Sequence, residues 1–130
     1  MRILIDTHCW LWMVSEPERL SKQARRKITD INNERVLSAA SAWEIAIKHS
    51  IGKLDLPEPP VEFVPSRMAL TLTTPLAVQL SHALQAARLP FHHRDPFDRL
   101  LIAQAQIEKT PILTADAEFS AYDVEIIPAG

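Results

Sequence analysis

Short apolar runs alternate along the chain with longer segments of mixed polarity. The runs are rich in isoleucine, leucine, valine or threonine and cover residues 3–5, 35–38, 68–73, 111–114 and 124–127. A short, continuously apolar run is typical of a strand at the centre of a sheet that is covered on both faces. The pattern therefore predicts five strands.

Segments with apolar residues at helical spacing separate these runs. They cover residues 8–14, 21–31, 43–51, 75–87 and 97–108, and a further helix is expected to start near residue 61. Ser21 is suited to cap the second of these helices, Gly52 to end the third, and Pro75 to stand in a first turn. Strands that alternate with helices indicate an α/β protein with a parallel sheet.

The bulk composition narrows the class of protein. With 130 residues, of which 47% are hydrophobic and 23% charged, the chain is expected to form one globular domain over residues 1–130. The formal net charge of −2 gives no overall basic signature for nucleic acid, although local basic residues remain possible. Only two glycines are present, so a glycine-rich phosphate loop or dinucleotide-binding motif is excluded.

The chain has a single cysteine, Cys9, which excludes an intramolecular disulfide and fits a reducing cytoplasm. Cys9 lies in an apolar run and is expected to be a packed thiol rather than a nucleophile. No stretch approaches the roughly 20 apolar residues that a membrane span needs. The residues before the first acid are too few for a signal peptide. A soluble, cytoplasmic protein without a membrane partner is therefore expected.

Four acidic residues stand in apolar surroundings, where an unpaired carboxylate is costly: Asp6, Glu44, Asp98 and Asp116. Asp6 follows the first predicted strand and Asp116 follows the fourth. Ligands of open α/β sheets bind at the carboxyl ends of strands. Gathered carboxylates need a cation, and hard divalent ions such as Mg²⁺ or Mn²⁺ take oxygen ligands.

Each acid also has a structural explanation. Asp6 and Asp116 are favoured residues for a helix cap or a turn. Glu44 fits a capping box with Ser41, whereas a helix starting at Ser38 would place it further inside. Asp98 lies in the first turn of its helix, where the dipole favours negative charge, on the face that leads into the apolar side.

Asp95 is a fifth acid beside these four. It precedes Pro96, which is a favoured residue at the first helical position, so Asp95 is well placed as an N-cap. It can therefore be explained by the helix start alone.

Four sequence blocks carry a resemblance to a known family. They are Ile3-Leu4-Ile5-Asp6-Thr7, Ser41-x-x-Glu44-Ile45, Asp98-Arg99-Leu100-Leu101-Ile102-Ala103-Gln104-Ala105 and Leu113-Thr114-x-Asp116-x-x-Phe119. These blocks resemble the four acidic blocks of PIN domains, most closely those of VapC-type toxins of bacterial toxin–antitoxin modules. They occur in the family's order and span residues 3–119, which is nearly the whole chain.

The resemblance implies a PIN-like three-layer α/β/α sandwich with a central, mostly parallel sheet. It also implies metal-dependent endonucleolytic cleavage of RNA, with Asp6, Glu44, Asp98 and Asp116 as catalytic residues and ligands of Mg²⁺ or Mn²⁺. Asp95 and Thr114 are candidates to support the metal site without direct coordination. The family further implies a homodimer and a small antitoxin that inhibits the toxin.

RNA must approach a negative site, so basic residues should surround it. Arg94, Arg99, Lys48 and Lys53 lie beside the acidic blocks and are candidate phosphate contacts. The neighbouring pair His92-His93 could contact RNA but lacks the spacing of a zinc site, so we assign no metal to it. Three tryptophans, Trp10, Trp12 and Trp43, lie in apolar helices and are expected to pack in the core rather than to stack on bases.

Other classes of protein fit less well. A phosphatase of the haloacid-dehalogenase type would use Asp6 as nucleophile and would carry a second aspartate two residues later, where this chain has His8. A structure-specific DNA nuclease would need additional DNA-binding elements. The main alternative is a non-catalytic PIN-like module that binds RNA or protein, which is expected to lack one or more of the acids.

Overall fold

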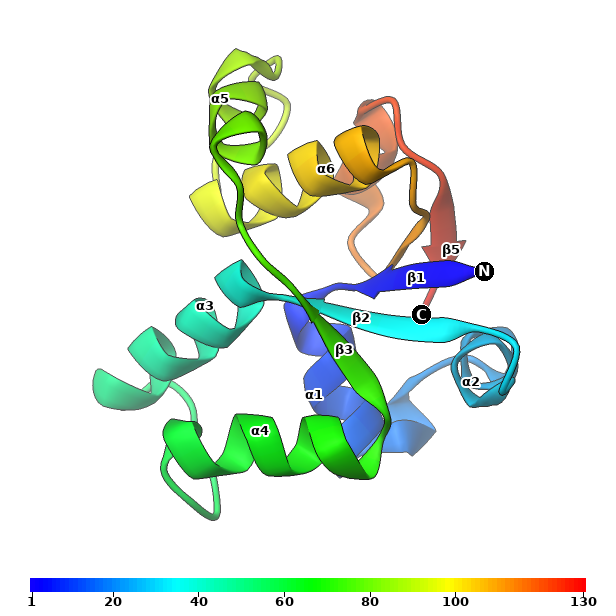
Figure 1. Ribbon diagram of the computed structural model, residues 1–130, viewed down its shortest axis with the longest axis vertical. Helices are drawn as coiled ribbons and strands as arrows, with labels where there is room; N and C mark the ends of the chain where they lie inside the picture. The colour runs from blue at the N-terminus through cyan, green and yellow to red at the C-terminus, as the bar shows by residue number, and fades with distance from the viewer.

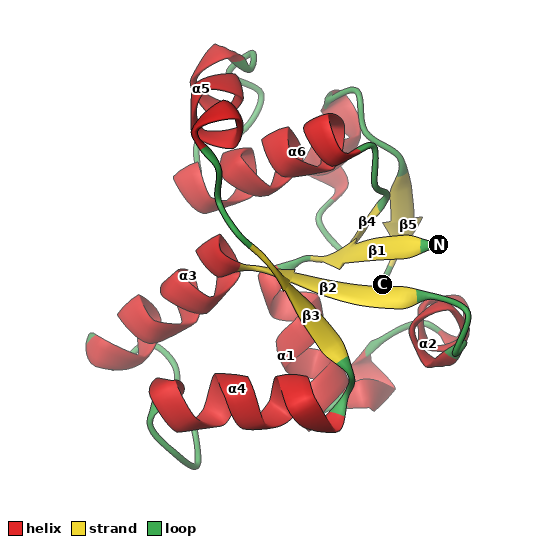
Figure 2. Ribbon diagram, in the orientation of Figure 1, coloured by secondary structure: helices red, strands yellow, loops and turns green.

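A computed structural model describes residues 1–130, and its centre is a five-stranded sheet (Figures 1 and 2). The sheet order is β3-β2-β1-β4-β5 and every neighbouring pair is parallel. The strands are β1 (Arg2–Ile5), β2 (Glu34–Ser38), β3 (Thr73–Leu76), β4 (Ile112–Thr114) and β5 (Ile126–Pro128).

Helices cover both faces of this sheet (Figure 1). The helices are α1 (Thr7–Ser15), α2 (Lys22–Thr29), α3 (Ala39–Ser50), α4 (Pro60–Leu70), α5 (Leu80–Arg88) and α6 (Pro96–Glu108), with short 3-10 helices η1 (Pro17–Arg19) and η2 (Ala117–Ala121). In Figure 1, α5 and α6 lie above the sheet while α1, α2 and α4 lie below it. No helix is both long enough and apolar enough to cross a bilayer.

Alternate residues of β1 belong to two separate hydrophobic cores. Ile3 and Ile5 are fully buried with residues of α1 to α4, whereas Leu4 packs with residues of α6 and η2. A strand with both faces buried has a continuous run of apolar residues, and this run allowed β1 to be predicted from the sequence. The expected α/β/α sandwich is confirmed, and its sheet is entirely parallel.

The region between α4 and α5 differs from the prediction. Of the strand expected at residues 68–73, residues 68–70 instead end α4, residues 71–72 form a turn, and β3 begins at Thr73. The helix expected from Pro75 begins only at Leu80, because Pro75 lies within β3. β3 pairs only with β2 at the edge of the sheet, where the missing N–H of a proline is tolerated.

Several end signals in the sequence are confirmed. The Ser21 side chain accepts a hydrogen bond from the Ala24 N–H at the start of α2. Gly52 adopts a positive φ of 75° just after α3, a conformation that favours glycine. Cys9 is a fully buried free thiol whose pKa is raised to about 12 by burial, so it is a packing residue.

Candidate active site

The four acids predicted from the sequence come from four different elements at the carboxyl edge of the sheet. Asp6 follows β1 and Asp116 lies two residues after β4, the strand beside β1. Glu44 lies in α3, and Asp98 lies in the first turn of α6. The chain moves to one side of β1 with β2 and β3 and to the other side with β4 and β5. The acids therefore gather where the strand order reverses, the usual ligand position in such sheets.

Thr114 connects two of these acids. Its hydroxyl donates to Asp6 Oδ2 at 2.8 Å and accepts from the Asp116 backbone N–H at 3.0 Å. Asp6 is only 5% exposed, and its other oxygen, Oδ1, has no hydrogen-bond partner. Burial raises the pKa of Asp6, and the charge of Glu44 adds to this effect. Thr114 thus orients one oxygen of Asp6 and leaves the other available.

Glu44 is buried in α3 and paired on one side only. Its Oε2 accepts from Lys48 Nζ at 2.7 Å, while the buried Oε1 has no partner. The cap of α3 is Ser38, whose side chain accepts from the Ala40 N–H. Glu44 is therefore not part of a capping box with Ser41, whose hydroxyl instead accepts from Thr7 Oγ1 at 2.8 Å.

Asp98 has the most perturbed carboxyl group of the site. Burial raises its pKa to about 8, and the nearby charges of Asp6, Asp95 and Glu44 contribute in the same direction. A carboxyl group this perturbed is common in functional sites, where like charges are brought together. Asp95 itself caps α6 by accepting from the Phe97 and Asp98 N–H groups, at 2.8 and 3.3 Å.

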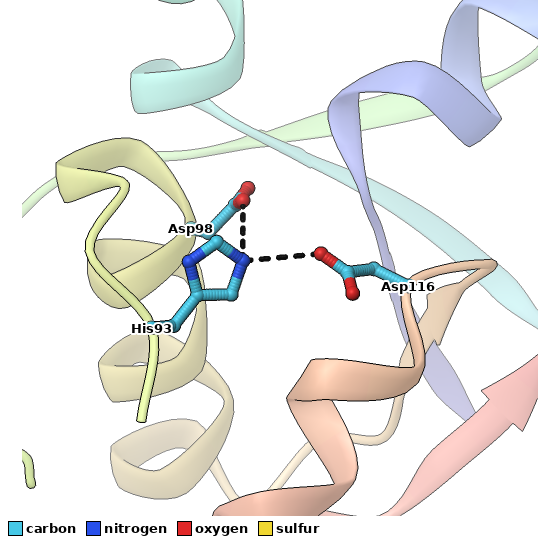
Figure 3. A group of neighbouring side chains, drawn as sticks. All are labelled: His93, Asp98 and Asp116. Atoms are coloured by element: carbon cyan, nitrogen blue, oxygen red, sulfur yellow. Dashed lines mark hydrogen bonds and ion pairs between the residues drawn. The ribbon is translucent and has the colours of Figure 1, made fainter. Parts of the chain in front are cut away.

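His93 completes the site, although the sequence assigned it no role at a metal. Its Nε2 lies 3.1 Å from Asp98 Oδ2 and 3.0 Å from Asp116 Oδ2. Figure 3 shows how the imidazole points toward both carboxylates. Burial opposes protonation of the imidazole, but the hydrogen bond to Asp116 and the surrounding acids raise the pKa of His93. The spacing of histidines typical of zinc sites could not predict that His93 lies at this site. Its partners come from α6 and from the segment after β4 rather than from a nearby histidine.

The carboxylate oxygens of the site fit a hard cation. One ligand atom each from His93, Asp98 and Asp116 lie within 4.8 Å of one another, a span that one metal ion could bridge. Asp6 and Glu44 add buried oxygens without hydrogen-bond partners. Unpaired buried oxygens are costly, and a divalent cation would satisfy them.

Arg99 corrects one sequence-based prediction. It is 7% exposed, and its guanidinium donates to four backbone carbonyls, at 2.8 to 3.3 Å, those of Ala86, Leu89, Pro90 and His93. Its sequence position next to Asp98 suggested a phosphate contact. The side chain instead points into the interior and holds the loop between α5 and α6, so it is not available to RNA.

The other basic candidates remain accessible. Arg94 and Lys53 are exposed, and Lys48 is half-buried beside Glu44. Lys48 and Lys53 line one hollow of about 340 Å³ together with Thr7 and His8. Because Thr7 and His8 directly follow Asp6, this hollow opens beside the acidic site.

The three tryptophans differ in burial. Trp10 is fully buried and donates through Nε1 to Thr73 Oγ1, and Trp12 packs against the same core beneath the guanidinium of Arg19. The expectation of core packing is wrong for Trp43, which is 63% exposed. Ser41, Glu44 and Ile45 lie on the buried side of α3, whereas Trp43 lies on its exposed side.

Known proteins resemble this chain in sequence and in structure. A 60-residue segment is 48% identical to Ribonuclease VapC16 of Mycobacterium tuberculosis, covering 46% of this chain and 43% of that protein. The match thus spans less than half the length of this curated relative. VapBC2 of Rickettsia felis, solved with a promoter DNA fragment, has a TM-score of 0.73 at 12% identity and full coverage of both chains. DNA-bound VapBC of Salmonella typhimurium has a TM-score of 0.73 at 13% identity over 98% of both chains.

At these identities the solved structures establish the fold, and the family follows from the sequence itself. The PIN domain model matches residues 3–125, which include all four acidic blocks. This chain therefore belongs to the PIN domain family.

Proposed function

We propose that this protein is a metal-dependent endoribonuclease. The observation that carries the proposal is the set of buried acids: Asp6 and Glu44 each hold an unpaired oxygen near Asp98, whose pKa burial raises to about 8. Such a set favours a hard divalent cation, Mg²⁺ or Mn²⁺. When bound, the cation would supply a water activated near neutral pH and would offset negative charge on the scissile phosphate.

The residues of the chain orient the site for this chemistry. Asp6, Glu44, Asp98 and Asp116 would hold the cation. Thr114 orients Asp6 through its hydroxyl and Asp116 through the backbone. Lys48 holds one oxygen of Glu44, and the N-cap Asp95 anchors the first turn of α6 that carries Asp98. The supporting roles expected for Asp95 and Thr114 are thus consistent with their contacts.

Basic residues at the rim would position the RNA. Lys48 and Lys53 share the hollow beside Asp6, and Arg94 is exposed in the loop that carries His93. Contacts from such residues to phosphates place a nucleic acid without reading its sequence. Charge neutralisation is needed here, because the acids would otherwise repel the RNA backbone.

We further infer that the protein is the toxin of a toxin–antitoxin pair. The support is the similarity of the chain to a VapC ribonuclease in sequence and to VapBC complexes in structure. A hollow of about 280 Å³ between α1 and the segment after α3 is a candidate site for an antitoxin segment. Its lining is mixed, with four apolar residues, Leu11, Trp12, Leu54 and Leu56, beside polar and charged residues that include Glu16, Arg19 and Asp55. We also propose that the protein forms a homodimer in solution, and measuring its molar mass by light scattering tests this.

The activity is tested with purified protein and single-stranded RNA in Mn²⁺ or Mg²⁺. Asp6→Asn and Asp98→Asn should each reduce cleavage by more than about 100-fold, since even residues that only support a metal ligand contribute 10- to 100-fold. Asp123→Asn changes an exposed acid and serves as the matched control. Chelation by EDTA should abolish cleavage by the unsubstituted protein.

Undiminished activity of both aspartate variants would reject this assignment. Binding of RNA by the unsubstituted protein without cleavage in any divalent ion would favour the non-catalytic module instead. If the product of an adjacent reading frame is an antitoxin, adding it should suppress cleavage.

A further inference from the structure

Trp43 is exposed immediately beside a buried catalytic acid. Its exposure is 63%, whereas the next residue, Glu44, is 2% exposed. Because both lie in α3, one turn of this helix presents a carboxylate to the interior and an indole to solvent. An exposed indole offers a large, flat, amphipathic surface for contact with a partner.

Phe97 holds the indole in place. The ring centroids of Trp43 and Phe97 are 5.4 Å apart with an interplanar angle of 73°, an edge-to-face contact between α3 and α6. Phe97 directly precedes Asp98, just as Trp43 precedes Glu44. The two helices that bring these acids together therefore also bring together an aromatic pair at the rim of the site.

An apolar hollow adjoins the indole on the α4 side. It measures about 320 Å³ and is lined, besides Trp43, by alanines and valines of α3 and α4 and by two prolines, including Ala42, Ala46, Val61 and Val64. None of the side chains that line it carries a charge or a hydrogen-bonding group other than the indole. The surface suits a flat apolar group and offers nothing to distinguish one base from another.

We propose that Trp43, supported by Phe97, stacks on a nucleobase of the RNA next to the cleaved phosphate. The inference rests on the proposed ribonuclease function. Trp43 contacts Phe97, which directly precedes Asp98, so the indole lies at the end of α6 that carries an acid of the site. Lys48, one turn after Glu44 in α3 and paired with it, is placed to contact the backbone of a nucleotide bound there. Aromatic stacking is tolerant of sequence because every base has a π face.

The proximity to the acids favours RNA over a protein as the occupant. A single base needs only a ring and its support, which Trp43 and Phe97 provide. Basic residues near the acids and an aromatic residue at the rim are the two components of sites for single-stranded nucleic acid.

The test measures binding of a short single-stranded RNA by fluorescence anisotropy in Ca²⁺, with the RNA checked for integrity. Trp43→Ala should weaken binding by roughly 5- to 150-fold, and Trp43→Phe should retain most of the affinity because it keeps a ring. Ile31→Ala is the control. Ile31 is 92% exposed, but it precedes β2 and therefore lies at the amino ends of the strands, away from the acids at their carboxyl ends. In Mn²⁺, the Trp43→Ala variant should raise KM more than it lowers kcat.

A second set of RNAs locates the contact. Removing one base at a time should weaken binding to the unsubstituted protein at one position, and Trp43→Ala should be insensitive to removal of that same base. Normal RNA affinity in Trp43→Ala would overturn the stacking role while leaving the ribonuclease proposal intact. Failure of the unsubstituted protein to bind or cleave RNA would overturn both. A shift from dimer to monomer in Trp43→Ala, without loss of RNA affinity, would assign the surface to a protein interface.

Discussion

At the scale of one residue, Asp98 shows how burial and neighbouring negative charges affect the acids of the site. Its carboxyl group is close to the charges of Asp6, Asp95 and Glu44, and burial raises its pKa to about 8. His93 lies 3.1 Å from it and offsets part of this repulsion. Without a cation the folded protein therefore favours a protonated Asp98, whereas a metal ion would favour the carboxylate.

Asp98→Asn is expected to stabilise the metal-free protein while abolishing its activity. At pH 8 the substitution removes a repulsive charge and should raise the free energy of unfolding by on the order of 1–2 kcal/mol. Urea unfolding in EDTA measures the effect. Near pH 4 the gain should disappear, because the carboxyl group is then protonated in the folded state. A loss of stability at pH 8 would contradict this account of Asp98.

At the scale of elements, the loop between α5 and α6 determines where His93 lies. The buried Arg99 donates to carbonyls at the end of α5 and in this loop, including that of His93. Its guanidinium also lies 4.4 Å from the ring centre of Phe91. Tyr122 adds a second anchor, since its hydroxyl accepts from the His93 N–H and donates to the Pro90 carbonyl. Helix α6 thus carries both an acid of the site and the arginine that orders the preceding loop.

Arg99→Lys should destabilise the protein by about 2–4 kcal/mol, because an ammonium group cannot donate to four carbonyls at once and leaves buried acceptors unpaired. Thermal or chemical unfolding measures this change. Arg94→Ala, five residues earlier and exposed, should change stability by less than about 0.5 kcal/mol but weaken RNA binding. Equal stability of the two variants would show that the Arg99 hydrogen bonds contribute little.

At the scale of the whole molecule, the sheet order collects the charges. β1 lies between β2 and β4, so residues near positions 6, 44 and 116 meet although they are far apart in the chain. Two hydrophobic cores hold the helices on opposite faces of the sheet and keep the acids in this arrangement. We therefore expect the stability of the folded chain to respond to pH and, if the proposed metal site is correct, to divalent ions.

The metal-free protein should lose stability as the pH rises from about 4 to 8. The pKa of Asp98 is raised from 3.8 to about 8 on folding, so the folded state binds more protons than the unfolded state in this range. The raised pKa of His93 acts in the same direction, since its contribution is lost as the pH rises through its folded-state value. Adding Mn²⁺ or Mg²⁺ should stabilise the protein more at pH 8 than at pH 6, because the ion competes with protons.

Thermal melts across this pH range, with EDTA or with a divalent ion, measure the effect. The same melts of the Asp6→Asn variant provide the comparison, because a weakened metal site should show less stabilisation by the ion. A metal-induced shift that is larger at pH 6 than at pH 8 would contradict the assignment of the raised pKa values to this site.

The order of local patterns along the chain determined much of the fold. The runs at β1, β2, β4 and β5 are apolar because their apolar side chains pack into one of the two hydrophobic cores. Ser21, Gly52 and Asp95 mark helix ends through local hydrogen bonds or backbone geometry. The four acidic blocks identified the family and the candidate ligands, because each acid stands in a short sequence motif that can be recognised without the structure.

Tertiary structure alone decided the features that depend on distant partners. Pro75 could enter β3 because that strand lies at the edge of the sheet, and Arg99 turned inward because the α5–α6 loop offers four carbonyls. His93 joined the acids, and Trp43 was left exposed against Phe97, through contacts between segments far apart in the sequence. Local spacing encodes helices, strands and caps, whereas the surroundings of a side chain depend on which elements the fold brings beside it.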